Sequence, residues 1–207
     1  MKKENAIVLL TSLMTIFLIA SNISSKKIIE FNDYIRLTAG FFTYPFVFLF
    51  AGVIIGIANK KTYFHSIFVS YISYLAFISL MIITAKIDGL ESQEQLNESF
   101  KIIFNLNEYR IFFSSFLAYL VSMISFYYFY KYINGSLYKK ILLSVLLSSI
   151  LDVNIFLIIS FFGEIKIYEL FTLLLSATLK KILTQIILVP PTVKLIKMIK
   201  NEKNNSN

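Results

Sequence analysis

The fold of this chain is constrained most by six long apolar segments, separated by shorter stretches that carry most of the charged residues. Each segment approaches the roughly 20 residues that an α-helix needs to cross about 30 Å of hydrocarbon. Charged residues make up only 15% of the sequence, whereas soluble domains carry about 25%. We therefore predict an all-α, polytopic membrane protein with six transmembrane helices, over residues 6–23, 37–58, 64–85, 111–130, 141–163 and 168–196.

The distribution of basic residues predicts how these spans are oriented. Eleven lysines and arginines fall on the side that holds both termini, and seven fall on the other side. The positive-inside rule then places both termini in the cytoplasm, with the chain in the cell (inner) membrane. We expect one domain over residues 1–200 and a disordered cytoplasmic tail over the polar residues 201–207. The longest connection, 86–110, is either an ordered connector or an amphipathic helix on the outer surface of the membrane.

Several functional classes fit this composition poorly. The chain has no cysteine and a single histidine, His65, so thiolate or multi-histidine metal sites are not expected, and we predict no cofactor. The basic residues flank apolar segments instead of forming a binding stripe, so we expect no nucleic-acid partner. The sequence shows no nucleophile–base pattern, no phosphate-binding glycine loop and no carboxylate pair. We therefore do not expect an enzyme.

The most informative residues are charges inside the predicted spans. Asp152 lies near the middle of the fifth span, and Lys180 and Lys181 lie near the middle of the sixth. A charge at the bilayer centre costs at least about 2.5–3.5 kcal/mol, so such residues usually face a partner or a wet cavity. If the two helices are antiparallel neighbours, Asp152 and one lysine lie at similar depth and can form an ion pair. This pair either fixes helix packing or lines a polar substrate cavity.

Other polar and structural signals surround this pair. Thr43-Tyr44-Pro45 falls inside the second span, where proline is expected to bend the helix. Small residues at 114, 115, 118 and 122 lie on roughly one face of the fourth span, a pattern typical of close helix packing. Further hydrogen-bonding groups near the ion pair are Ser148, Ser149, Asn154, Thr184 and Gln185.

A series of short motifs, from about residue 16 to 196, resembles the queuosine-precursor transporter family, also described as a vitamin uptake transporter type. The motifs are Ala20-Ser21-Asn22-Ile23, Lys27, Ala39-Gly40, Thr43-Tyr44-Pro45, Phe48-Leu49, Arg110, Ser115, Ala118-Tyr119, Ser122, Ser148-Ser149-Ile150-Leu151-Asp152, Phe156, Phe161-Phe162-Gly163, and Lys181 nine residues before Pro190. The resemblance implies a six-helix inner-membrane carrier that imports deazaguanine bases, the cyano and aminomethyl precursors used in tRNA modification.

A planar, hydrogen-bond-rich base suits the residues found here. Aromatic rings can stack on such a base while polar side chains bind its edges. The Asp152 carboxylate could accept paired N–H groups from a guanine-like edge. The expected substrate-binding residues are Asn22, Lys27, Tyr44, Arg110, Ser122, Asp152, Asn154, Lys181 and Gln185.

The chain departs from this family at several acidic positions. After the Tyr-Pro motif the family has an acidic pair four residues apart, where this chain has Gly52 and Gly56. In the fourth span, Met123 and Phe126 stand where the family has Gln and Asp. Either the substrate differs, or ion coupling has changed, or the protein is a divergent member.

Two further functions remain open at this level. The chain could be the substrate-binding membrane subunit of an ATPase-driven vitamin importer, or a non-transport accessory membrane protein whose polar residues only hold helices together. We expect a small-molecule substrate and a lipid bilayer as partners, with a homo-oligomer or an ATPase module as further possibilities.

Overall fold

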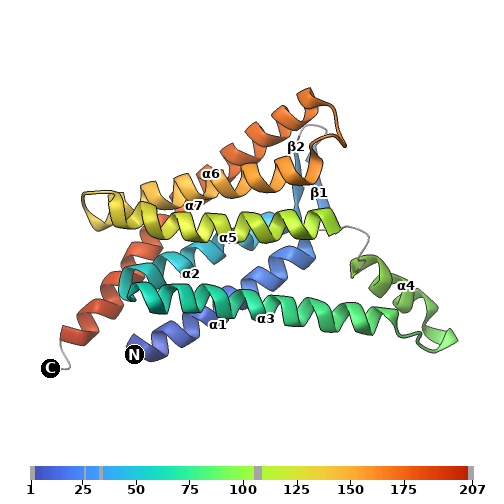
Figure 1. Cartoon of the computed structure of the whole chain (residues 1–207), viewed down its shortest axis with the longest axis horizontal. Coiled ribbons are helices and arrows are strands. Elements are labelled where there is room, and N and C mark those ends of the chain that lie inside the picture. Colours follow the sequence, from blue (N-terminus) through green and yellow to red (C-terminus); the bar gives the residue numbers. More distant parts are fainter. Residues whose placement is uncertain (1–2, 26, 33–34, 105–108, 205–207) are drawn as a thin grey trace.

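The computed structural model describes residues 3–25, 27–32, 35–104 and 109–204. The described elements follow one another as α1 (Lys3–Ser24), β1 (Ile28–Asn32), β2 (Ile35–Thr38), the 3-10 helix η1 (Ala39–Phe42), α2 (Tyr44–Ile57), α3 (Lys60–Lys86), the 3-10 helix η2 (Glu91–Gln93), α4 (Glu94–Ile103), α5 (Tyr109–Tyr132), α6 (Leu137–Phe161) and α7 (Ile167–Asn204). Figure 1 shows these elements as one bundle of long helices.

Six segments of the described chain are long and apolar enough to cross a membrane. They are α1, α3, α5, α6, most of α7 and the continuous stretch Ala39–Ile57 made by η1 and α2. The predicted all-α, multi-pass membrane fold is therefore confirmed. Both ends of the chain lie at the same end of the bundle, here called the termini end, whereas the β1–β2 hairpin and α4 lie at the opposite end, here called the hairpin end (Figure 1).

The second span differs from the prediction at its start. Residues 37–58 were expected to form one helix bent at Pro45, but η1 ends at Phe42 and α2 begins at Tyr44, with Pro45 in its first turn. Proline is favoured at this position because a first-turn N–H has no partner within the helix. Pro45 thus sets where α2 begins and does not bend it.

The hairpin end contains two elements that the sequence did not specify. Strands β1 and β2 pair antiparallel, with Ile28 opposite Thr38 and Ile29 opposite Leu37. In the connection 86–110, which was expected to be an ordered connector or an amphipathic helix, the structure contains the helix α4. Leu96 and Ile102 on α4 are exposed, and Phe104 just after it is buried.

Helix α7 is longer than the predicted span. It continues to Asn204, into the segment predicted to be a disordered tail, and residues 205–207 lie outside the described residues. Pro190 and Pro191 lie inside α7. Because proline has no N–H, the carbonyl groups of Ile186 and Ile187 lose their usual helical partners at this point.

Helix α2 lies at the centre of the packing, and 12 of its 14 residues are buried. The main core surrounds it with side chains from α1, α3 and α5 and from the termini-end halves of α6 and α7. A second, small cluster of Val153, Leu157 and Leu170 joins the hairpin-end halves of α6 and α7. The termini-end half of the bundle is therefore the more tightly closed half.

Candidate functional site: a buried carboxylate between four helices

Asp152 and Lys181 form an ion pair between α6 and α7. Helices α6 and α7 are antiparallel and joined by a short turn in which Gly163 has a φ of 85°, a conformation that favours glycine. The Asp152 and Lys181 side chains are only 7% and 12% exposed. The contact expected from the sequence is thus present, and both charges are largely removed from solvent.

The other oxygen of the Asp152 carboxylate accepts hydrogen bonds from two further helices. The Tyr44 hydroxyl on α2 donates to Oδ1 over 2.7 Å, and the Ser122 hydroxyl on α5 donates to the same atom over 3.2 Å. Lys181 donates to Oδ2. We call Tyr44, Ser122, Asp152 and Lys181 the Asp152 cluster; it draws one residue from each of α2, α5, α6 and α7.

Aromatic rings cover the ammonium group of this cluster. Lys181 Nζ lies 4.3 Å from the centroid of the Tyr44 ring and 5.3 Å from that of Phe48. The Phe48 ring in turn lies 6.0 Å from the Phe126 ring on α5. Cation–π attraction at these distances favours a desolvated ammonium. One cluster therefore combines a carboxylate, a cation, two hydroxyls and flat aromatic surfaces.

Two buried polar groups beside the cluster have no hydrogen-bond partner among the described residues. They are the Tyr119 hydroxyl and the Gln185 side-chain nitrogen. Gln185 is 1% exposed and lies one helical turn after Lys181, on the same face of α7. Tyr119 lies one turn before Ser122 on α5 and is 2% exposed. A buried group without a partner is costly, so these two are available to a bound molecule.

The structure places Asn22 in a second polar contact nearer the hairpin end. Its side-chain oxygen accepts a 3.0 Å hydrogen bond from Ser115 on α5, and its nitrogen donates to the Leu18 carbonyl. Ser115 precedes Ser122 by two turns on the same face, which is about 10 Å along α5. Asn22 therefore lies outside the Asp152 cluster, displaced from it toward the hairpin end.

Asn154 belongs to another part of α6. It follows Asp152 by two residues, which turns it to roughly the opposite side of the helix. Its nitrogen donates to the Ile150 carbonyl on the same helix. The structure does not bring Asn154 to the Asp152 carboxylate.

The other two basic residues expected at the site lie at the hairpin end. Lys27 is exposed, just beyond the end of α1. Arg110 donates to the carbonyl oxygens of Ile159 and Phe162 and pairs with Glu164 at 2.9 Å. Since Arg110 precedes Ser122 by 12 residues, it lies about 18 Å along α5 from the cluster. Arg110 holds the end of α6 and the turn that follows it.

Phe48, Tyr119 and Phe126 were not expected as site residues. From the sequence, Phe48 and Tyr119 were motif positions only, and Phe126 was a departure from the family pattern. In the structure all three are at most 2% exposed. The available signal was the spacing of Phe48 and Tyr119, which lie one turn from Tyr44 and Ser122 respectively.

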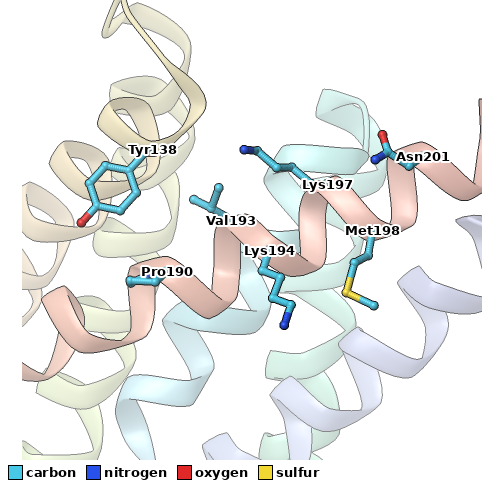
Figure 2. A pocket seen from close by; sticks show the side chains of 7 residues that line it. All are labelled: Tyr138, Pro190, Val193, Lys194, Lys197, Met198 and Asn201. Carbon is cyan, nitrogen blue, oxygen red and sulfur yellow. The ribbon is translucent and has the colours of Figure 1, made fainter.

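Two cavities lie at the ends of the helices and are not lined by the cluster. One, of about 410 Å³, runs along α7 at the termini end (Figure 2). The other, of about 240 Å³, lies between the end of α3 and α4 at the hairpin end. In this structure the Asp152 cluster is closed off from both of these cavities.

A family model described as "putative vitamin uptake transporter" matches residues 38–195. The chain belongs to this family. The match includes every member of the Asp152 cluster, whereas Asn22 and Lys27 precede it. No curated protein and no solved structure matches the chain. A member of the vitamin uptake transporter family with six membrane-spanning segments has a small-molecule substrate and a lipid bilayer as its partners.

Proposed function

We propose that this member of the vitamin uptake transporter family imports a small, planar, nucleobase-like molecule, specifically a deazaguanine precursor of queuosine. The observation that carries the proposal is the buried Asp152 carboxylate, which is surrounded by donors from three other helices. Beside it, Tyr119 and Gln185 offer buried donors that have no partner among the described residues. A guanine-like edge has the complementary arrangement of donors and acceptors.

In the proposed binding mode, N–H groups of the substrate replace a protein donor on the Asp152 carboxylate. The carboxylate has two oxygens and can accept two parallel N–H groups from one edge of a base. In the present structure Tyr44 and Lys181 occupy these oxygens. A substrate that replaces Lys181 at Oδ2 would leave the ammonium free to bind a carbonyl of the same base. The Tyr44 and Phe48 rings are inclined at 69° to each other, so one would stack on the flat face of the base and the other would contact its edge.

The predicted substrate-binding residues outside the Asp152 cluster have different proposed roles. Gln185 binds an edge of the base, Asn22 lines the route to the cluster from the hairpin end, and Asn154, which faces away from Asp152, takes no part in binding. Lys27 and Arg110 stand at the hairpin end, where an imported molecule would enter. This assignment uses the predicted topology, with a single domain over residues 1–200 in the inner membrane and both termini in the cytoplasm.

The experiment is uptake of labelled deazaguanine precursors by cells that lack their own synthesis and transport of these bases. Wild type is compared with Asp152→Asn, and Asp88→Asn is the matched control. Asp88 makes an ion pair with Lys101, but its side chain is 87% exposed. At equal abundance in the membrane, we expect wild type and Asp88→Asn to import the base and Asp152→Asn to lose at least 90% of uptake.

Other outcomes identify the competing functions. Uptake only when an ATPase module is co-expressed would make the chain a substrate-binding subunit. Normal uptake by Asp152→Asn would mean that the Asp152 cluster only holds the helices together and does not bind substrate. Absence of uptake by correctly inserted wild type, with or without such a module, would reject the deazaguanine substrate.

A further inference from the structure

The cavity at the termini end has a basic rim and a partly apolar floor. It follows one face of α7, at positions spaced by three or four residues, and is closed on one side by α6. Its lining residues are Tyr138, Pro190, Val193, Lys194, Lys197, Met198 and Asn201. Figure 2 shows Lys197 and Asn201 extending to one side of α7, and Lys194 and Met198 extending to the other. The two ammonium groups therefore flank the helix face between them.

The lining carries two positive charges and no acidic residue. Lys139 at the start of α6 and Lys200 on α7 are also exposed at this end of the bundle. Like charges gathered around one cavity raise its affinity for an anion. Lysine binds a phosphate group as a point charge, without the planar geometry that arginine requires.

The depth of the cavity fits a lipid headgroup. Lys194 follows Lys181 by 13 residues on α7, which corresponds to about 20 Å of helix. If the Asp152 cluster lies near the middle of the bilayer, the hydrocarbon ends about 15 Å away and the headgroup region extends to about 20–22 Å. Lys194 then lies at the level of the phosphates, Lys197 lies about one turn farther out, from where its long side chain can reach back to them, and Pro190 and Val193 lie nearer the acyl chains.

We propose that this cavity binds the phosphodiester headgroup of an anionic phospholipid from the adjacent leaflet. Lys194 and Lys197 contact the phosphate, and Pro190 and Val193 contact the glycerol and upper acyl chain. A lipid fits better than a soluble phosphate compound because apolar side chains continue from the basic rim toward the membrane interior. The inference goes beyond the proposed transport function, since it concerns neither the Asp152 cluster nor the imported molecule.

The test measures lipid binding to the purified full-length protein in neutral detergent by native mass spectrometry. Phosphatidylglycerol is compared with phosphatidylcholine of the same acyl chains, and inorganic phosphate is the third ligand. The variant is Lys194→Gln with Lys197→Gln. The control is Lys3→Gln with Lys61→Gln, which removes the same charge from two exposed lysines at the same end of the bundle but outside the cavity.

We expect wild type and the control to bind phosphatidylglycerol in preference to phosphatidylcholine. The cavity variant should bind phosphatidylglycerol roughly 30-fold more weakly, as two lysine–phosphate contacts are lost. Equal weakening in both double variants would mean that only net charge matters and would overturn the site. Equal binding of the two lipids would also overturn it, and competition by inorganic phosphate alone would replace the lipid with a soluble ligand. Thermal unfolding without added lipid checks that each variant is folded.

Discussion

Replacing Asp152 alone should lower the free energy of unfolding more than replacing both Asp152 and Lys181. In Asp152→Asn, the Lys181 side chain stays at 12% exposure but loses the carboxylate that compensates its charge. Removing one partner of a buried ion pair typically costs about 3–5 kcal/mol, because the remaining charge is left uncompensated. We expect a destabilisation of that size for this variant.

The complementary variant, Lys181→Met, should cost less. It removes the cation beside Asp152, but Tyr44 and Ser122 still donate hydrogen bonds to the Asp152 side chain. The double variant, Asp152→Asn with Lys181→Met, removes both charges and keeps similar side-chain volumes. Replacing a buried pair with neutral groups is often close to neutral in stability, so the double variant should be more stable than Asp152→Asn alone.

The assay is reversible chemical unfolding of the purified protein in mixed micelles, with Asp88→Asn as the exposed control. An exposed pair contributes about 0–1 kcal/mol, so the control should change stability little. A double variant that loses as much stability as the sum of the single variants would refute the reasoning about uncompensated charge.

The same variants separate packing from substrate binding. If the cluster binds substrate, the double variant regains stability but does not regain uptake. If the pair only fixes helix packing, uptake returns together with stability, and the proposed role of Asp152 in recognition is wrong.

Three further predictions concern neighbouring contacts. Tyr44→Phe removes a 2.7 Å hydrogen bond to Asp152 but keeps the ring, so the half-saturating substrate concentration for uptake should rise by roughly 10-fold or more, as expected for a lost bond to a charged group. Gly56→Ala places a Cβ about 2.5 Å from Ile196 Cδ1, so unfolding measurements should show a loss of about 1–3 kcal/mol that Ile196→Ala partly restores. Arg110→Ala should increase protease cleavage at the α6–α7 turn, because it removes the bonds that hold the end of α6.

Much of the fold could be predicted because each signal was local in the sequence. A membrane span needs only a sufficient run of apolar residues, and six such runs are present. The pairing of Asp152 with a lysine followed from two costly charges at similar depth on neighbouring antiparallel helices. Which of Lys180 and Lys181 would pair was not determined, because that depends on the rotation of α7 about its axis.

The features that were missed depend on three-dimensional packing. Hydropathy does not distinguish a helix bent at Pro45 from a 3-10 helix followed by a new helix, since both give the same apolar run. The hydrogen bond from Tyr44 to Asp152 joins residues 108 positions apart. Similarly, the burial of Phe126 depends on contact with Phe48 of α2, which no pattern within α5 specifies.

The packing of α2 against α7 explains why this chain has Gly52 and Gly56 at positions that were expected to be acidic in the family. A Cβ at Gly52 would lie 3.1 Å from Thr192, and one at Gly56 would lie within 3.1 Å of three carbons of Ile196. Carboxylates at these two positions would therefore require the termini-end half of α7 to move away from α2. In this chain α2 and α7 are in close contact at both glycines, so we expect a charge that responds to substrate to lie elsewhere in the bundle. The Asp152 cluster is where we expect that response; its Tyr44 lies about two turns from Gly52 on α2, and its Lys181 lies on α7.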